Sequence, residues 1–510
     1  MMKKSISCLL CAATLLIGLA SCGAEVPSEY EEGGRTVAVT PDYTGVTIPC
    51  NIAPLNFRIG IEGDDYVTRL RTKANPEGIV VSGRDLDIPV DEWHDLIGKV
   101  KGDSVYTDIF VRRNGKWKRY GTEPNAIADS IDPYISYRLI EPSYIGYETM
   151  AICQRNLTDF DESEIFNSQS LSESGNGQCI NCHSYQDYNR GERMQMHVRG
   201  RLGGTVIACG DILTKVTLKT PATISNGVYP SWHPTLPLIA YSVNETSQSF
   251  HSRDRNKVEV QDGASDLVLY DVEKNSVGII ANDSTELETF PYWHPDGRSL
   301  WYVSAKVPAM SPDEMKVYEN TNYEDFKYDI YRKPFDPATR TFGRTDTVLR
   351  VSGQGKSATL PRPSPDGRYL LFTAGSYGTF HIWHRDADLY LLDIATKAVR
   401  PLSEVNSPDV ESYHSWSSNG RWIIFSSRRD DGSYTRLYIA YFDRNGKARK
   451  PFRLPQATPD YDDNRMKSYN IPEFMARPVS ISKKELEDAI QGEILKAAIE
   501  ARTAEVNEAR

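Results

Sequence analysis

The fold is decided by a repeated stretch, whose clearest copy reads Pro291-Tyr292-Trp293-His294-Pro295-Asp296-Gly297 before the apolar run Leu300-Trp301-Tyr302-Val303. The Asp-Gly pair supplies the positive φ angles that a tight hairpin turn requires. The β-branched and aromatic residues on either side of the turn suit buried strands. The stretch therefore predicts a strand, a turn and a second strand.

The same unit recurs in the second half of the chain, with further copies starting at Tyr229, Pro361 and Tyr413. Each copy is followed by a second pair of strand-like runs, which makes four strands per unit. The unequal spacing between copies falls in polar inserts at 244–265 and 308–326. Radially arranged four-stranded blades accept such inserts, so we expect a β-propeller.

The repeat resembles that of TolB-type β-propellers, which have an aromatic residue, Ser, Pro, Asp and Gly at the hairpin leading into an apolar strand. The resemblance covers about residues 194–455 and implies a propeller of about six blades. Two weaker blades are expected before the four clear copies, one from the strand-like runs in 194–218 and one from 134–139 with 150–166. Propellers act as scaffolds, binding platforms and enzymes, so the resemblance does not imply a particular chemistry.

The chain outside the repeats adds further segments. Residues 38–130 show short alternating runs without the turn repeat, which predicts a β-sandwich-like domain. We assign 131–166 to a first blade, 167–193 to a polar loop and 194–480 to the propeller. The expected fold class is therefore all-β.

A helix is expected at the C-terminal end, in residues 481–510. Ser482 and Glu485 form a capping box. Apolar residues follow at helical spacing, namely Leu486, Ile490, Ile494 and Ala497. This pattern predicts an amphipathic helix.

The first residues read as an export signal. Lys3 and Lys4 precede the apolar run 6–19, which has the length of a secretory signal core. Leu19-Ala20-Ser21-Cys22 then resembles a bacterial lipobox, in which cleavage before the Cys leaves its thiol and amine for acylation. This resemblance implies a signal peptide at 1–21, lipidation of Cys22 and a tether at 22–37. The alternative is an ordinary signal peptide with a chance Cys.

Charge and hydropathy restrict the partners. The chain has 59 Lys and Arg against 69 Asp and Glu, a net charge of −10, so nucleic-acid binding is disfavoured. No apolar run after the signal reaches transmembrane length. We therefore expect a body that the lipid on Cys22 anchors in the cell envelope, facing the periplasm or on the outer-membrane surface.

The most specific chemical motif is Cys179-Ile180-Asn181-Cys182-His183, which matches C-x-x-C-H. Two thiols at this spacing can add to the vinyl groups of haem, and the following His can bind the iron. The motif resembles a cytochrome c attachment site. The resemblance implies haem c on Cys179 and Cys182, with His183 as the proximal ligand. The predicted export of the protein agrees with this, because c-type haem is attached to exported proteins.

The second axial ligand and two other interpretations stay open. Met194, Met196 and His197 lie just downstream and are candidates for the distal iron ligand, although Met in a strand also suits a core. On a strand, the two Met residues share one face and His197 points to the other. Alternatively, Cys179 and Cys182 form a disulfide, or they form half of a metal site completed by His197 or Cys209.

A haem would give the protein a role in electron transfer or haem-based sensing, with a redox partner that the sequence does not identify. The alternative is a haem-free scaffold that binds protein or glycan partners at the envelope. Hydrolase activity is disfavoured because G-x-S-x-G is absent and no α/β domain is expected. Cys50 and Cys153 both precede the repeats, so an oxidising envelope predicts a disulfide between them.

Overall fold

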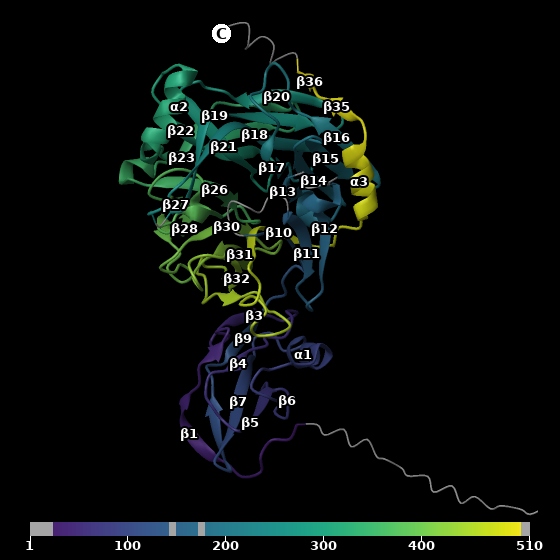
Figure 1. Cartoon of the computed structure of the whole chain (residues 1–510), viewed down its shortest axis with the longest axis vertical. Coiled ribbons are helices and arrows are strands. Elements are labelled where there is room, and N and C mark those ends of the chain that lie inside the picture. The colour runs from purple at the N-terminus through teal and green to yellow at the C-terminus, as the bar shows by residue number, and fades with distance from the viewer. Residues whose placement is uncertain (1–23, 142–148, 172–178, 255, 501–510) are drawn as a thin grey trace, which may run out of the picture.

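The computed structural model describes residues 24–141, 149–171, 179–254 and 256–500 (Figure 1). Within these residues the sheets form a six-bladed β-propeller, with a smaller N-terminal domain attached to its rim beside the first and sixth blades. The predicted all-β propeller fold is therefore confirmed.

Each blade is an antiparallel sheet built around the predicted hairpins. The second and third blades contain β13 Cys179–Tyr185, β14 Arg193–Arg199, β15 Gly204–Cys209, β16 Ile212–Thr217, β17 Val228–Trp232, β18 Leu238–Phe250, β19 Val258–Asp271 and β20 Ser276–Ala281. The fourth contains β21 Glu286–Trp293, β22 Ser299–Lys306, β23 Tyr328–Asp336, β24 Thr341–Phe342 and β25 Asp346–Leu349, with helix α2 Pro312–Thr321 between β22 and β23. The fifth and sixth contain β26 Ser357–Pro363, β27 Tyr369–Gly375, β28 Asp388–Asp393, β29 Val399–Pro401, β30 Glu411–Trp416, β31 Trp422–Ser427, β32 Arg436–Tyr441 and β33 Phe452–Arg453.

The first blade combines strands from distant parts of the chain. Its strands β10 Tyr134–Ile140, β11 Ala151–Asn156 and β12 Glu162–Asn167 lie where the weak sequence signal placed a blade. Strand β34 Ser468–Met475 pairs with β10 in antiparallel register, from Tyr134 opposite Met475 to Ile140 opposite Ser468. Because β34 also packs against β30 of the sixth blade, this pairing closes the ring.

The C-terminal helix α3 Lys483–Gln491 is shorter than expected. Its capping box between Ser482 and Glu485 is present, and Leu486 and Ile490 are buried. The chain turns extended at Gly492, and β35 Ile494–Lys496 then pairs in parallel with β16. Strand β36 Ala498–Ile499 pairs in the same way with β20. The outer edges of two blades thus provide backbone partners for residues that the sequence pattern had assigned to a longer helix.

The N-terminal domain contains a seven-stranded sheet, a two-stranded sheet and a short helix. Helix α1 Val90–Ile97 was not predicted, and it buries Trp93, Leu96 and Ile97 against the sheet. The strands are β1 Glu31–Thr36, β2 Val39–Thr40, β3 Thr47–Pro49, β4 Arg58–Ile59, β5 Asp65–Arg71, β6 Ile79–Ser82, β7 Ser104–Arg113, β8 Lys116–Gly121 and β9 Asn125–Ala128.

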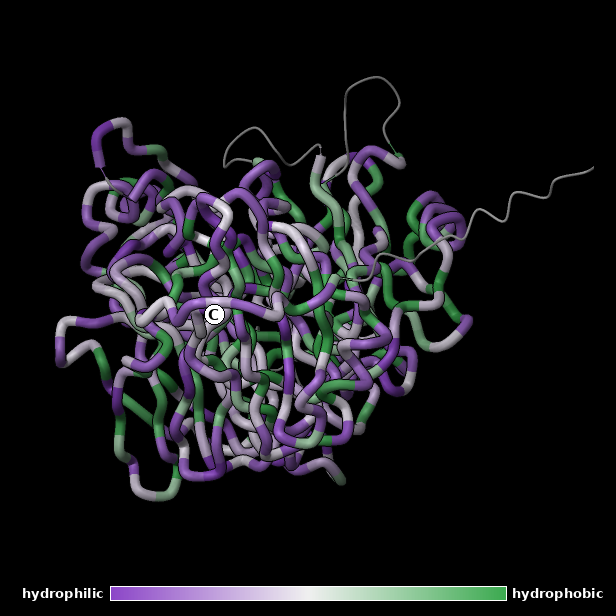
Figure 2. The backbone as a smooth tube through the Cα atoms, turned by 90° about the horizontal axis from the view of Figure 1, so that it is seen from below, coloured by the Kyte–Doolittle hydropathy of each residue, from purple (hydrophilic) through white to green (hydrophobic). Residues whose placement is uncertain are grey.

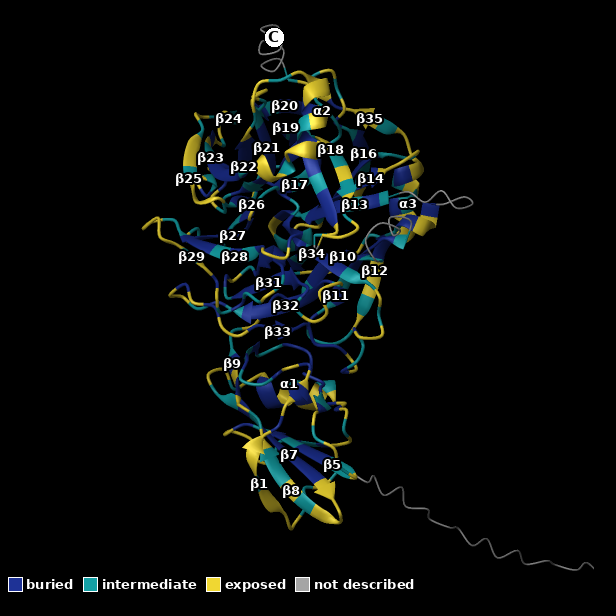
Figure 3. Cartoon of the chain, turned by 60° about the vertical axis from the view of Figure 1, so that its left-hand side comes forward, coloured by how far each residue is buried: buried dark blue, intermediate teal, exposed yellow. Residues whose placement is uncertain are grey.

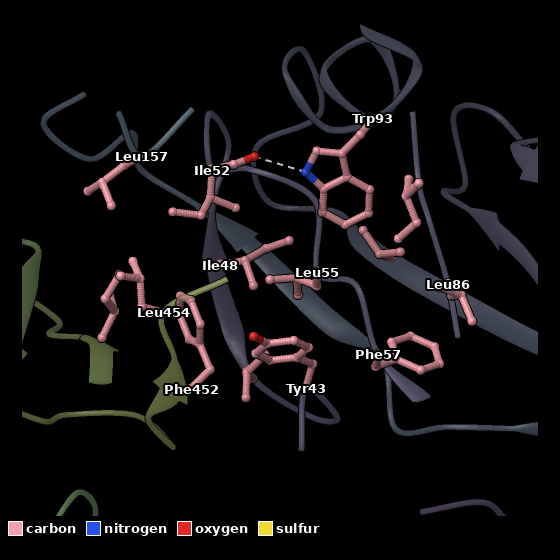
Figure 4. Packing of buried hydrophobic residues seen from close by; sticks show 14 of the residues in the cluster. Tyr43, Ile48, Ile52, Leu55, Phe57, Leu86, Trp93, Leu157, Phe452 and Leu454 are labelled. Atoms are coloured by element: carbon pink, nitrogen blue, oxygen red, sulfur yellow. Dashed lines mark hydrogen bonds between the residues drawn. The ribbon is translucent and has the colours of Figure 1, made fainter. Parts of the chain in front are cut away.

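One apolar core joins this domain to the propeller. Figure 4 shows Tyr43 and Ile52 of the domain in the same cluster as Leu157, Phe452 and Leu454 of the first and sixth blades. The indole Nε1 of Trp93 donates to the Ile52 carbonyl at 2.9 Å within this cluster. Figure 3 shows buried strands in both the propeller and the N-terminal domain.

The predicted Cys50–Cys153 disulfide is absent, because both residues are free thiols. Cys153 is buried on β11 of the first blade, whereas Cys50 lies half-buried in a turn of the N-terminal domain. Cys153 belongs to the first blade and Cys50 to the N-terminal domain, so their common position before the four clear repeats did not imply a bond between them.

Hydrophobic and hydrophilic residues are interleaved along the backbone rather than gathered in one span (Figure 2). Among the described residues, no helix has the length and apolar character needed to cross a bilayer.

Candidate functional site

The innermost strand of every blade contains a residue with left-handed backbone at an equivalent point. The residues are Cys182, Tyr229, Phe290, Leu360, Tyr413 and Ile471, with φ between 47° and 53°. The strand register shifts beside each of them, as in a β-bulge. All six line the narrow central channel. A left-handed residue at this position in all six blades reflects the geometry of the ring. A site for a single ligand would not require such a residue in every blade.

The C-x-x-C-H motif lies on one of these inner strands rather than in the expected loop 167–193. Strand β13 pairs with β14, so that Cys179 lies opposite Arg199 and Asn181 opposite His197. Ile180 is buried in the core between the first and second blades, while Cys179 and Asn181 face a cavity. The bulge at Cys182 breaks the two-residue alternation, which explains why the sequence did not read as a strand.

The cavity is a wide opening of about 730 Å³ at one end of the channel, and we call it the funnel. Its volume is in the range of small-molecule and cofactor sites. Cys179, Cys182 and His197 lie on its wall. Aromatic and charged residues complete the lining, chiefly Tyr229, Phe250, Phe380, Trp383, Tyr413, Arg138, Arg199, Arg428, Glu141 and Glu245.

Both thiols of the motif are free. Cys179 is half-buried and Cys182 is buried. Burial raises the pKa of the Cys179 thiol, and the positive charges of Arg199 and Arg138 partly oppose this shift. The structure therefore contains no disulfide between Cys179 and Cys182.

His183 follows Cys182 but lies in the narrow part of the channel, at the seam with the first blade. Burial lowers the pKa of its imidazole to about 3, so the ring is neutral at physiological pH. The backbone of Ile471 and Ser136 lies beside the ring. Neither ring nitrogen makes a hydrogen bond of acceptable geometry within the described residues.

His414 occupies the equivalent position in the sixth blade and provides a direct comparison. Its ring is also buried, and its Nε2 lies 3.1 Å from the Leu371 carbonyl, at hydrogen-bonding distance. His414 therefore bonds across a seam between blades, whereas His183 sits in the same kind of seam without such a bond.

The distal-ligand candidates separate into two environments. Met194 and Met196 are buried in the core between the first and second blades. His197 is buried on the funnel wall, with its Nδ1 3.1 Å from Thr205 Oγ1. Burial lowers the pKa of His197 to about 3. Of the three candidates, the structure brings only His197 to the cavity that the thiols face.

A metal site built from several protein ligands finds no support. The described residues contain no group of three or more His, Cys, Asp or Glu arranged to hold a metal ion. Cys209 lies at the end of β15 opposite Arg193 and does not line the funnel.

The sequence did not indicate Arg138, Trp383 and Arg428 as site residues. They come from the first, fifth and sixth blades, and each lies in a stretch without a motif. Cys22 and the rest of the predicted signal lie outside the described residues.

No family model and no curated protein matches the sequence. Among solved structures, the chain is similar to TolB from Acinetobacter baumannii, with 12% identity, a TM-score of 0.41, and coverage of 76% of this chain and 85% of that one. It is also similar to prolyl oligopeptidase B from Galerina marginata, at 8% identity and a TM-score of 0.37, covering 69% of this chain and 42% of that one. A third is an oligogalacturonate lyase from Vibrio parahaemolyticus, at 13% identity and a TM-score of 0.30, covering 61% and 92%. These similarities concern the fold alone.

Proposed function

We propose that this protein is a lipid-anchored envelope propeller that carries one covalent haem c and serves electron transfer or haem-based sensing. Cys179 and Cys182 would hold the haem, and His183 would be its proximal iron ligand. The observation that carries the proposal is the placement of the two free thiols of a C-x-x-C-H motif on the wall of a 730 Å³ funnel.

Two observations on the residues present are compatible with this group, and the position of His183 would have to change. The thiols are not consumed by a disulfide, and the funnel beside them has room for a large planar ligand. His183 is neutral at physiological pH, so one ring nitrogen has a lone pair for a metal, but the ring lines the narrow channel and not the funnel, so it would have to turn toward the funnel to bind the iron. A bound haem supplies one-electron chemistry.

The chain's own residues would set the environment of that chemistry. Tyr229, Trp383 and Tyr413 line the funnel with apolar rings, which limits the access of water. His197 is the distal-ligand candidate on the same wall, and its Thr205 partner holds one ring nitrogen.

The competing function is a haem-free propeller scaffold that binds protein or glycan partners at the envelope. The equivalence of His183 and His414 favours this function. In the sixth blade, His414 bridges to the neighbouring blade, so a His at this position has a structural role there. In that case C-x-x-C-H is a variant of the inner-strand sequence.

The deciding experiment is an absorption spectrum of the full chain made in a host with haem-attachment machinery. We expect wild-type protein to carry haem that survives denaturing electrophoresis. Cys179→Ala with Cys182→Ala should abolish it, whereas Cys209→Ala, in the same blade but outside the motif, should retain it. Wild-type protein without covalent haem would reject the proposal in favour of the scaffold.

A second comparison tests the axial ligands. His183→Ala should keep the covalent attachment but change the Soret and α bands of the reduced protein, because the iron loses its proximal ligand. His414→Ala, at the equivalent blade position, should leave those bands unchanged. Equal spectra for the two variants would show that His183 does not bind the iron. Single replacements of Met194, Met196 and His197 then identify the distal ligand.

The lipid anchor has its own test. Cys22→Ala should release the protein from membranes, because the acyl chains provide the attachment. Cys11→Ala, inside the predicted signal peptide, is the control and should not change membrane partitioning. Retention of the Cys22→Ala variant in the membrane fraction would contradict lipidation at this residue.

A further inference from the structure

Among the described residues, Arg428 is a buried cation with no carboxylate at ion-pair distance. It directly follows β31 on the funnel wall and is 8% exposed. Its guanidinium stacks on Trp383, 4.1 Å from the ring centroid. In the described part of the chain, no carboxylate lies within ion-pair distance of Arg428, and its Nε has no hydrogen-bond partner. Buried charges in proteins are normally paired, so this arrangement requires an explanation.

Other buried or half-buried arginines of the sixth blade have polar partners for their guanidinium groups. Arg453 is 7% exposed and lies between 3.5 and 3.7 Å from Asp430, Asp462 and Asp463. The neighbouring Arg429 donates to Glu411 at 2.9 Å. Arg436 on β32 has no carboxylate at ion-pair distance among the described residues either, but its guanidinium donates to the backbone carbonyls of Asp462, Arg465 and Lys467. Arg428 differs from all three in facing the funnel with no such partner at its Nε.

Arg428 remains a cation at physiological pH. Burial lowers the pKa of its guanidinium to about 10, and the more distant Asp409 and Asp431 oppose this shift in part. Within the described part of the chain, no ion pair compensates for the desolvation of this cation.

Arg138 supplies a second buried cation on the funnel wall. It lies on β10 of the adjacent blade, is 8% exposed, and its Nε donates to Asn470 Oδ1 at 3.0 Å. It also lacks a carboxylate at ion-pair distance within the described residues. Of the acidic residues that line the funnel, Glu141 lies 3.7 Å from Lys467. The described residues on the wall between the first and sixth blades therefore carry a net positive charge.

We propose that Arg428 and Arg138 form a site for a carboxylate of a ligand that enters the funnel. Guanidinium groups bind carboxylates through short, charge-assisted hydrogen bonds, and Trp383 offers an aromatic surface beside them. This carboxylate can come from either of two kinds of ligand. It belongs either to a porphyrin in the funnel, which rests on the proposed function, or to a free acidic ligand, which does not.

The experiment uses the full chain with Cys179→Ala and Cys182→Ala, so that no haem is attached. Binding is measured by calorimetry in two arms. The first compares protoporphyrin IX with its dimethyl ester, and the second compares D-glucuronate with D-glucose. Each pair differs in the carboxylate, so a preference for the acid reports the proposed contact.

In one of the two arms, we expect the acid to bind at least about tenfold more tightly than the matched neutral compound. Arg428→Met should remove about 10- to 100-fold of that affinity, and Arg428→Lys should retain part of it because the charge remains. A preference in the first arm assigns the porphyrin, and a preference in the second assigns a free acidic ligand. Equal binding of the acid and the matched neutral compound in both arms would overturn the proposal, whether or not the wild-type protein carries haem.

Thermal unfolding of the ligand-free variants separates binding from structure. Arg428→Met should raise the Tm by about 1–2 °C, since it removes an unpaired buried charge and keeps an unbranched side chain. Arg453→Met should lower the Tm, because it leaves three carboxylates without their partner. If Arg428→Met lowers the Tm as much as Arg453→Met does, Arg428 stabilises the folded protein and the proposal fails.

Discussion

Glu288 lies on β21, the inner strand of the fourth blade, and is 3% exposed. The Asp283 backbone N–H donates to its Oε1 at 3.3 Å, while its Oε2 has no partner among the described residues. Burial raises the pKa of the Glu288 carboxyl to about 8, and the negative charges of Asp266 and Glu286 add to this shift. Glu288 is therefore protonated at neutral pH in the folded protein.

This protonation predicts a pH dependence of stability. In the unfolded chain the carboxyl ionises near pH 4.5, whereas in the folded protein it holds its proton up to about pH 8. Its contribution to stability is therefore complete below pH 4.5 and is lost as the pH rises to 8. Glu288→Gln cannot titrate, so it should be more stable than wild type by up to about 4 kcal/mol at pH 8, with the difference vanishing near pH 4.5.

Denaturant unfolding between pH 4 and 9 measures this difference. Glu286→Gln, on the same strand but only half-buried, controls for the loss of a charge from β21. Parallel stability profiles for wild type and Glu288→Gln would show that the carboxyl is ionised in the folded protein.

The inner strands set the geometry of the channel at the scale of elements. Five of their six left-handed residues are unbranched at Cβ, but Ile471 on β34 is β-branched, with φ of 50°. A β-branched side chain is especially unfavourable in this region of φ and ψ. The strand that closes the ring therefore carries more local backbone strain than its five counterparts.

Removing the branch should relieve this strain. We expect Ile471→Leu to increase the free energy of unfolding by about 0.5–1 kcal/mol. The matched control is Ile439→Leu on β32, which is fully buried in an ordinary strand and should lower stability by up to about 1.5 kcal/mol. Equal losses for the two variants, measured by urea unfolding, would mean that packing outweighs the strain at Ile471.

At the scale of the whole molecule, the N-terminal domain and the propeller share one core. Trp422 of the sixth blade is buried in this core, and its Nε1 donates to the carbonyls of Asp129 and Ser130, at 3.2 and 3.1 Å. Ser418 of the same blade donates to Asp132. These contacts fix the domain to the seam where β34 closes the ring.

The shared core predicts that the protein unfolds in one cooperative transition. Calorimetric and van't Hoff enthalpies should agree, and Trp422→Ala should lower the midpoint of that single transition through a loss of about 3–5 kcal/mol. Trp301→Ala, in the core of the fourth blade, should shift the same transition. Two separate transitions, only one of which responds to Trp301→Ala, would show that the domain and the propeller unfold independently.

The sequence by itself determined the features that depend on neighbouring residues. Asp296-Gly297 and Asn419-Gly420 place positive-φ glycines between apolar runs, and strands form on both sides of them. The capping box at Ser482 likewise starts α3 where it was expected. Turn and cap chemistry acts within a few residues, so it can be read along the chain.

Only the tertiary structure decided the features that depend on distant partners. Residues 179–185 form a strand because β14 and the first blade cover them, although their own pattern is polar. The chain after Gly492 leaves the helix because β16 and β20 offer free edges. Arg138, Trp383 and Arg428 meet at the funnel because ring closure brings three blades together. Burial and pairing of this kind arise from contacts across hundreds of residues, which no local pattern records.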